Sequence, residues 1–238
     1  MPRTPQQIVI LTGAGVSAES GLGTFREEGG MWSKFDPYKL ASPEGFAENP
    51  ALVQEFYNLR RKNLLEAAPN AAHVALGRLQ EGLALHDGLV TIVTQNIDDL
   101  HERGGACDVI HMHGELLKAR CLGCGAIVEQ REDITDASAC APCGAVGRLR
   151  PHVVWFGEIP LHLDDIAAAL DTADLFVSIG TSGAVYPANG FVAHARARRV
   201  ATLELNLEPS DGAALFDDAR YGPASKVVPA WVEEILHA

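Results

Sequence analysis

Four of the five cysteines form two C-x-x-C pairs, Cys121/Cys124 and Cys140/Cys143, separated by fifteen residues. Each pair can offer two thiolates to one tetrahedral ion, and four thiolates leave no position for a catalytic water. The spacing therefore predicts one structural Zn2+. Redox disulfides are the alternative, although neither pair has the strand-to-helix context of a thioredoxin-like motif. We expect the remaining Cys107 to be a small buried hydrophobe.

A glycine-rich loop is the second chemical feature. Residues 12–18 read TGAGVSA, fit G-x-G-x-x-[GA], and directly follow the apolar run Ile8–Leu11. Such glycines allow a backbone to approach a pyrophosphate closely, although an ordinary glycine turn is the alternative. A dehydrogenase should show an Asp or Glu ending a second strand about 20 residues later. Residues 20–27 read SGLGTFRE instead, so the sequence favours a dinucleotide without hydride transfer.

Polar side chains follow another apolar run, Leu89–Thr94. They are Gln95, Asn96 and Asp98, whose amide and carboxylate groups suit ribose hydroxyls and a nicotinamide amide. Helix capping by Asn96 or Asp98 is the alternative, and both roles are compatible.

Histidines supply the candidates for a general base. His113 follows the apolar pair Val109-Ile110, and an imidazole with a pKa of about 6.5 suits proton transfer at neutral pH. A structural histidine is the alternative reading, and His101, His111 and His152 are rivals for the role.

Strands and helices that could position these groups alternate along the chain. Continuous apolar runs between helical stretches are typical of a parallel sheet covered on both faces. We expect strands at Ile8–Thr12, Leu89–Thr94, Val153–Phe156, Leu175–Ile179 and Val200–Leu205, and helices at Ala71–Leu83, Leu163–Ala173 and Ala188–Arg198. The pattern predicts a Rossmann-like, doubly wound α/β sheet, with ligands at the carboxyl ends of its strands.

Two segments interrupt this alternation. Residues 35–70 include a predicted helix starting near Pro50 with Asn49 as its cap, and residues 115–150 carry the four paired cysteines. We expect both insertions to form a small helical and zinc-binding domain. The Rossmann-like domain then comprises residues 1–34, 71–114 and 151–238.

Composition excludes several classes of protein. The chain has 238 residues, of which 47% are hydrophobic and 21% charged, with a formal charge of −12. It is too apolar for disorder, and no apolar run approaches the ~20 residues of a membrane span. The negative charge argues against nucleic-acid binding through phosphates. We expect a soluble cytoplasmic protein that binds neither membrane nor nucleic acid; its oligomeric state stays open, a monomer included.

Four segments carry a family resemblance: residues 13–26, Thr94–Asp98, His113-Gly114 and Gly180–Ser182. In this order they resemble the sirtuin family of NAD-dependent protein-lysine deacylases, and the likeness extends over nearly the whole chain. It is closest to the short bacterial sirtuins of the class that includes desuccinylases.

The resemblance implies a deacylation that consumes NAD. The acyl-lysine amide oxygen attacks the ribose carbon that bears nicotinamide, nicotinamide leaves, and a ribose hydroxyl deprotonated by histidine then attacks the resulting imidate. The implied products are nicotinamide, free lysine and O-acyl-ADP-ribose.

The resemblance also implies site residues. It selects His113 as the general base because it precedes Gly114, with Asn96 as a second catalytic residue. Implied NAD contacts are Gly13, Ala14, Gly15, Ser17, Glu19, Thr24, Phe25, Arg26, Trp32, Gln95, Asn96, Ile97, Asp98, Gly180, Thr181, Ser182, Asn206, Leu207, Glu208 and Ala224. Implied substrate contacts are Tyr57, Arg60, Val153, Val154, Phe156 and Gly157. An acyl-peptide would add as a strand to the segment 152–158, for which a core strand is the alternative.

Tyr57 and Arg60 bear on the acyl group. They match the acyl-reading pair of the desuccinylase class, and their spacing places them on one face of the predicted helix 50–66. A phenol and a guanidinium can hold the carboxylate of succinyl- or malonyl-lysine. The alternatives are a solvated face formed by Arg60-Arg61-Lys62 and a partly buried Tyr57.

Other functions remain to be weighed against a deacetylase and desuccinylase. They are a catalytically weak NAD-sensing module that binds acyl-lysine, a deacetylase with little desuccinylase activity, and a simple NAD oxidoreductase. ADP-ribosyl transfer is a conceivable side activity.

Overall fold

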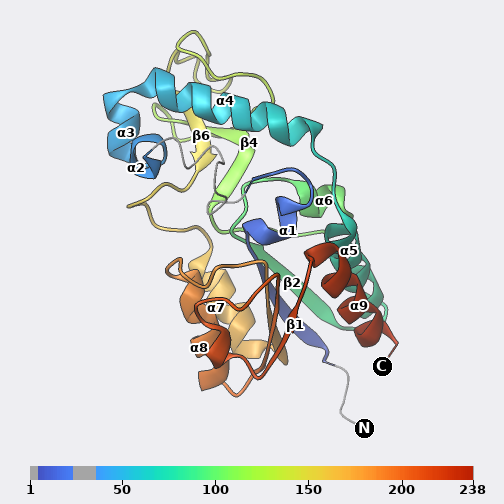
Figure 1. The fold of residues 1–238 in the computed structure, drawn as a ribbon. Coiled ribbons are helices and arrows are strands. Elements are labelled where there is room, and N and C mark those ends of the chain that lie inside the picture. Colours follow the sequence, from blue (N-terminus) through green and yellow to red (C-terminus); the bar gives the residue numbers. More distant parts are fainter. Residues whose placement is uncertain (1–4, 24–35, 238) are drawn as a thin grey trace.

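The computed structural model describes residues 5–23 and 36–237. These residues form two sheets (Figure 1). In the larger sheet every neighbouring pair of strands is parallel. Its strand order is β3 (Ile110–His111), β2 (Leu89–Thr94), β1 (Gln7–Thr12), β7 (Leu175–Ile179), β8 (Ala201–Asn206) and β9 (Asp218–Tyr221). From β1 the chain adds β2 and β3 on one side, and it later adds β7, β8 and β9 on the other side. The boundary between β1 and β7 is therefore the topological switch point, where such sheets bind ligands.

Helices cover both faces of this sheet because its strands are apolar on both sides. In β1, Ile8 and Ile10 face one core, with helices α5 (Ala71–Ala84) and α9 (Ala224–Leu236). Val9 and Leu11 face the other, with α7 (Leu163–Thr172) and α8 (Phe191–Ala197). The predicted doubly wound fold is confirmed. The short elements α1 (Ala14–Ala18), α6 (Leu100–Arg103), η2 (Ala188–Gly190) and η3 (Ala213–Leu215) lie in its connections.

A smaller part packs above the strand ends of the large sheet (Figure 1). Its helices are α2 (Pro37–Leu40), α3 (Pro43–Glu48) and α4 (Pro50–Glu66). Each begins with proline after a capping side chain, a strong start signal; as predicted, Asn49 Oδ1 accepts a hydrogen bond from Leu52 N at 3.1 Å. Val53, Tyr57 and Leu64 of α4 are buried.

The second sheet is antiparallel and supports the cysteine pairs. Its strands are β5 (Ile127–Glu129), β4 (Gly114–Cys121) and β6 (Leu149–Val153), in that order. The predicted fold class, with a smaller cysteine-bearing part, is thereby confirmed. The domain limits proposed from the sequence stay a prediction.

One predicted strand is wrong. The run Val153–Phe156 is not a strand of the parallel sheet, since β6 ends at Val153 and pairs antiparallel with β4. Beyond that residue the amides bond outside any ladder: Trp155 N donates to Glu158 Oε2 at 2.8 Å and Phe156 N to Ala41 O at 2.8 Å. The strand begins at Leu149 and includes Pro151, which an edge strand tolerates but which argues against a strand when only the sequence is read.

Two further sequence expectations need adjustment. The helix predicted over Ala188–Arg198 is split into η2 and α8. Cys107 is exposed rather than buried. It lies between α6 and β3, where its backbone N–H donates to Gln80 Oε1 at 2.8 Å. Backbone hydrogen bonding, and not side-chain burial, therefore anchors this position.

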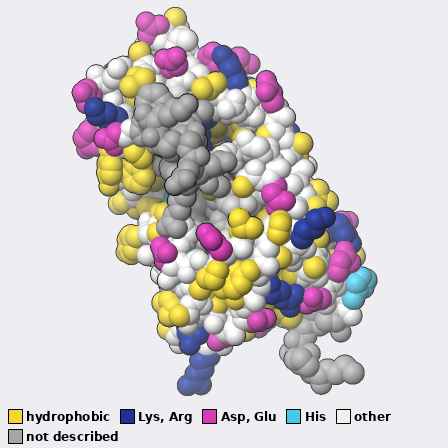
Figure 2. Space-filling model, viewed as in Figure 1, with side chains coloured by type: hydrophobic (Ala, Val, Ile, Leu, Met, Phe, Trp, Pro, Cys, Tyr) yellow, Lys and Arg dark blue, Asp and Glu magenta, His cyan; other side chains and the backbone are white. Residues whose placement is uncertain are grey.

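The surface carries charges of both signs. On the face drawn in Figure 2, acidic and basic side chains are interspersed among the described residues. None of the helices in the described ranges is both long and apolar enough to cross a membrane.

Candidate functional site

The sheet brings the predicted nucleotide-binding segments to one edge. Gly13 follows β1, Gln95 follows β2, Gly180 follows β7 and Leu207 follows β8. Because all these strands are parallel, their carboxyl ends lie side by side, directly below the small part (Figure 1). A crevice there is lined by residues that include Gln95, Thr181 and Ser178.

Glycines at this edge allow two loops to touch. Gly15 N donates to Gly180 O at 2.9 Å, and Gly13 N to Ile179 O at 3.0 Å. A Cβ on Gly15 would lie 2.8 Å from Gly180 Cα, and Gly180 has a φ of +62°. Both glycines are therefore required by contact between the two loops, in addition to the predicted approach to a pyrophosphate.

Ser17, Asn96 and Asp98 form a buried hydrogen-bond network beside the glycine loop. Ser17 Oγ donates to Asp98 Oδ2 at 3.0 Å and accepts from Asn96 Nδ2 at 3.1 Å. Asn96 Nδ2 also donates to Gly13 O at 3.2 Å, and Asp98 Oδ1 accepts from Leu100 N at 3.1 Å. The network joins segments far apart in sequence. Asp98 accepts from the first amide of α6, although the N-cap position itself belongs to Asp99, and its contact with NAD stays a prediction.

His73 belongs to this network, and sequence analysis missed it. Asn70 N donates to His73 Nδ1 at 3.2 Å, so the ring proton is on Nε2, which faces Ser17 Oγ at 3.3 Å. Burial lowers the pKa of His73 to about 4, and the ring is neutral at pH 7. The sequence does contain a signal for this role of His73: Asn70 and His73 occupy the N-cap and N3 positions of α5, which is the spacing of a capping box.

This buried histidine makes stability depend on pH. An unfolded histidine protonates near pH 6.5, whereas folded His73 resists protonation down to about pH 4. The contribution of His73 to the free energy of unfolding is therefore constant above about pH 6.5 and falls as the pH drops from 6.5 to 4. Between pH 7 and pH 5 we expect the wild type to lose about 2 kcal/mol more unfolding free energy than His73→Gln does.

Urea denaturation at the two pH values measures this difference. His86→Gln, which removes an exposed histidine, should lose as much on acidification as the wild type. The same loss in His73→Gln would contradict the assignment.

His101 and His111 are also buried near the strand ends. Burial lowers the pKa of His101 well below its usual value, and the ring hydrogen-bonds Thr12 Oγ1 at 2.9 Å. Burial alone would lower the pKa of His111, but its hydrogen bond to Glu102 at 2.7 Å raises it. These two rivals of His113 are thus held by partners inside the fold; the third, His152, is buried in β6, where burial lowers its pKa.

His113 differs from them in exposure. His101 and His111 also have an Nδ1 without a hydrogen bond, but that atom is buried, whereas the His113 side chain is only half-buried. Its Nδ1 lies 3.0 Å from Gln95 O, and because a carbonyl only accepts, Nδ1 carries the proton. Nε2 then holds the lone pair, and no hydrogen bond to it occurs within the described ranges. Burial lowers the pKa of His113, so the neutral ring is ready to accept a proton at pH 7.

The cysteine cluster fits a zinc ion. All four Sγ atoms lie within 4.8 Å of one another, and the pairs Cys121–Cys143 and Cys124–Cys140 are 3.8 Å apart. A tetrahedral site with Zn–S bonds of about 2.3 Å needs sulfur atoms about 3.8 Å apart. None of the five cysteines forms a disulfide, so the redox alternative has no support in this geometry.

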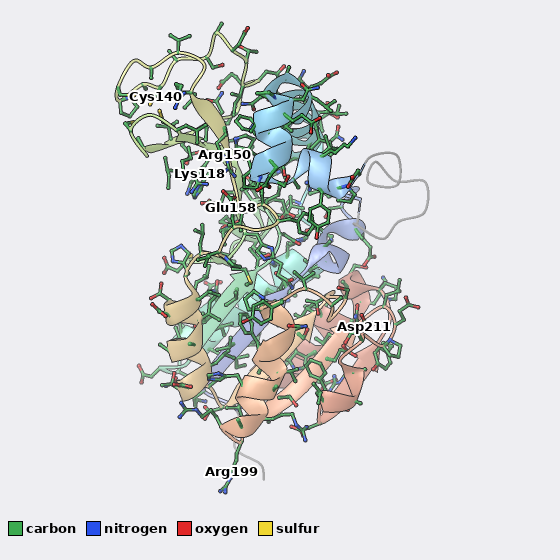
Figure 3. The ribbon with its side chains drawn as sticks, turned by 90° about the vertical axis from the view of Figure 1, so that its left-hand side faces the viewer. Lys118, Cys140, Arg150, Glu158, Arg199 and Asp211 are labelled. Atoms are coloured by element: carbon green, nitrogen blue, oxygen red, sulfur yellow. The ribbon has the colours of Figure 1, made fainter. Side chains whose placement is uncertain are left out.

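The backbone around the cluster has the form of two knuckles. Gly125 and Gly144 follow the cysteine pairs with φ of +76° and +72°, which glycine tolerates. Backbone hydrogen bonds from Cys124 and Gly123 lower the pKa of the Cys121 thiol and favour the thiolate. Cys140 lies at the outer end of the small part (Figure 3), which suits structure and not catalysis.

Tyr57 and Arg60 lie together on α4 as the spacing predicted. The Arg60 guanidinium carbon is 6.0 Å from the centroid of the Tyr57 ring and 5.7 Å from that of Phe56. Tyr57 is only 1% exposed, more buried than the alternative reading had it. Arg61 is wholly buried and donates to Leu116 O at 3.2 Å, so the three cations do not form one solvated face.

The predicted substrate segment lines a cavity of about 380 Å3, to which Val153, Val154 and Gly157 contribute. Val154 N donates to His113 O at 2.8 Å, which ties this segment to the candidate base. Since the amides of Val154, Trp155 and Phe156 are all engaged internally, an added peptide strand has to use carbonyl groups or the Gly157 N–H.

The other predicted NAD contacts lie around the same edge. Glu19 accepts two hydrogen bonds from Ser225, which lower the pKa of its carboxyl. Asn206 Nδ2 donates to Thr181 O at 2.8 Å. The remaining described ones, at loop or helix-start positions, are Ala14, Ile97, Ser182, Leu207, Glu208 and Ala224. Thr24, Phe25, Arg26 and Trp32 lie outside the described residues.

Comparison with known proteins gives consistent matches. The family model described as "Sir2 family" matches residues 13–187 of this chain. An "NAD-dependent protein deacylase" of Caulobacter vibrioides is 59% identical over 230 residues, covering 97% of each chain. The crystal structure of a Sir2 homolog–NAD complex is 37% identical with a TM-score of 0.87, covering 97% of this chain and 90% of that one. A Sir2 structure with a deacetylated p53 peptide and 3'-O-acetyl ADP ribose is 28% identical with a TM-score of 0.81, covering 97% and 94%.

Proposed function

The chain belongs to the Sir2 family, and on that premise we propose that it removes acyl groups from protein lysines while consuming NAD. The observation that carries the proposal is the placement of His113, whose lone-pair nitrogen is available at the strand ends where the family's nucleotide segments meet. The relatives named as NAD-dependent deacylases and the neighbour solved with NAD support it.

Bound NAD supplies the ribose that receives the acyl group, so that nicotinamide, free lysine and O-acyl-ADP-ribose are the products. The residues around it bind, orient and move one proton. Gly13, Gly15 and Gly180 keep the loops close, and Asn96 is held by Ser17. His113 Nε2 accepts the proton of a ribose hydroxyl, while the Gln95 carbonyl fixes the required tautomer.

Acylated peptides are the proposed substrates. The neighbour solved with a deacetylated peptide supports this class of partner. In this chain the cavity beside Val153, Val154 and Gly157 lies next to the backbone of His113. An acyl-lysine bound along this segment would therefore lie close to the proposed general base.

Among acyl groups, we propose that succinyl and malonyl are accepted together with acetyl. Tyr57 can donate one hydrogen bond and Arg60 several, and both stand on one face of α4. A carboxylate-ended acyl group can accept hydrogen bonds from both side chains, whereas an acetyl group carries no carboxylate to do so.

Replacing Arg60 tests this specificity. For Arg60→Ala we expect the succinyl-to-acetyl ratio of kcat/KM to fall about 10- to 100-fold, because a charged hydrogen bond is lost for one substrate only. Steady-state kinetics with matched succinyl-, malonyl- and acetyl-lysine peptides at fixed NAD measure it. Lys62→Ala is the matched control, an exposed cation on the same helix that pairs with Asp133 at 3.0 Å. Equal losses on both acyl groups in Arg60→Ala would remove the acyl assignment and leave deacylation standing.

A further inference from the structure

A buried hydrogen bond joins the substrate segment to the acyl-reading helix. Trp155 Nε1 lies 2.9 Å from Tyr57 Oη, and the two residues are 2% and 1% exposed. An indole N–H can only donate, so the Tyr57 oxygen is the acceptor. The phenol proton then needs an acceptor of its own, and within the described ranges no hydrogen bond is donated by this hydroxyl.

Trp155 is held firmly enough to impose this direction. The Arg150 guanidinium carbon lies 3.3 Å from the centroid of the indole ring. Glu158 accepts from Arg150 Nη1 at 2.7 Å, from Arg150 Nη2 at 2.9 Å and from Trp155 N at 2.8 Å. Figure 3 shows Arg150 and Glu158 close together between the cysteine-bearing end and the large sheet. Phe46 packs against the same core cluster, and the centroid of its ring lies 5.2 Å from that of Trp155.

The orphaned proton indicates which kind of acyl group Tyr57 and Arg60 would bind. A buried donor without an acceptor is costly, and burial raises the pKa of Tyr57, so the proton is not lost at neutral pH. With the Arg60 guanidinium 6.0 Å from the ring centroid, an acceptor that reaches both groups gains most if it is an anion. A carboxylate at the end of an acyl chain has that chemistry.

We propose that Trp155 is a positioning residue for acyl specificity: its N–H occupies the Tyr57 oxygen, so that the phenol proton is left for the carboxylate of an acidic acyl group. This inference rests on the proposed deacylase function and adds a residue to its specificity. Trp155 acts through Tyr57 and touches no reacting atom.

The test is a double-mutant cycle on the succinyl-to-acetyl ratio. Trp155→Phe keeps an aromatic ring and removes the N–H. We expect KM for the succinyl peptide to rise about three- to tenfold, the scale of one hydrogen bond, with little change in kcat, so that the ratio of kcat/KM falls. Tyr57→Phe should lower the ratio also, and Trp155→Phe should lower it no further in the Tyr57→Phe background.

Controls separate positioning from packing. Phe46→Leu removes a ring that touches Trp155 but leaves the N–H bond, and it should lower stability without moving the ratio. If Trp155→Phe fails to fold, 3-benzothienylalanine at position 155 keeps the indole shape and lacks the N–H.

Each outcome decides one claim. Additive effects of Trp155→Phe and Tyr57→Phe, or an unchanged ratio in Trp155→Phe while Tyr57→Phe lowers it, would overturn the role of Trp155 alone. An unchanged ratio in both Tyr57→Phe and Arg60→Ala would instead overturn the proposed acyl specificity.

Discussion

His113→Ala is expected to keep the fold and lose roughly 10²- to 10⁴-fold in kcat, the usual contribution of a positioned general base. The side chain is half-buried and, within the described residues, makes one hydrogen bond, to Gln95 O. Its removal therefore leaves no buried charge without a partner. Circular dichroism and zinc content should match the wild type. His162→Ala, which removes an exposed histidine, serves as the matched control and should retain full turnover.

The pH profile of the wild type adds a second readout. His113 must be neutral to accept a proton, and burial lowers its pKa below the usual histidine value. The acid limb of kcat should therefore fall below pH 6.5, with the rate lost as pH drops through that pKa. Activity of His113→Ala within tenfold of wild type would shift the role to a neighbour such as His111.

Loss of the metal should have the second large effect. Cysteine ligation of zinc contributes about 10–16 kcal/mol in small zinc-finger peptides, which is comparable to the whole free energy of unfolding of a typical domain, about 5–15 kcal/mol. The cysteine module has only a few buried apolar side chains around Cys121 and Cys140. We expect Cys140→Ala to bind no zinc and to lose the ordered structure of residues 121–148.

Metal analysis and limited proteolysis check this expectation. The wild type should carry one zinc per chain and resist cleavage between β4 and β6, whereas Cys140→Ala should be cut there rapidly. Cys107→Ala is the control, because that cysteine is exposed and lies outside the cluster. Metal-free protein with unchanged proteolysis and unchanged activity would show that the cluster has no structural role.

Local sequence patterns predicted the fold well where a strand or helix has clear start and end signals. The strands Leu89–Thr94 and Leu175–Ile179 begin and end where apolar runs do, and Asn49-Pro50 starts α4 as a capping signal should. The cysteine cluster was also predicted from the sequence, because two C-x-x-C pairs have the spacing typical of four zinc ligands. The error over Val153–Phe156 has a physical cause, since an apolar run does not reveal that its amides bond to Glu158 and Ala41.

Buried polar contacts between distant segments were the part that sequence could not supply. Arg61 follows Arg60 and looks like a surface cation, yet it is fully buried against Leu116 O. His73 joins Ser17 across the network, and Trp155 reaches Tyr57 over 98 positions of sequence. Such pairs are fixed by tertiary packing, so no local periodicity marks them.

The central claim is that acyl removal is coupled to breakage of NAD at this site. The most direct measurement follows nicotinamide and deacylated peptide together, with purified zinc-bound protein and an acyl-lysine peptide. We expect one nicotinamide released for each lysine freed, and neither product when NAD or the acyl group is omitted. Lysine freed at the same rate in the absence of NAD would contradict the account.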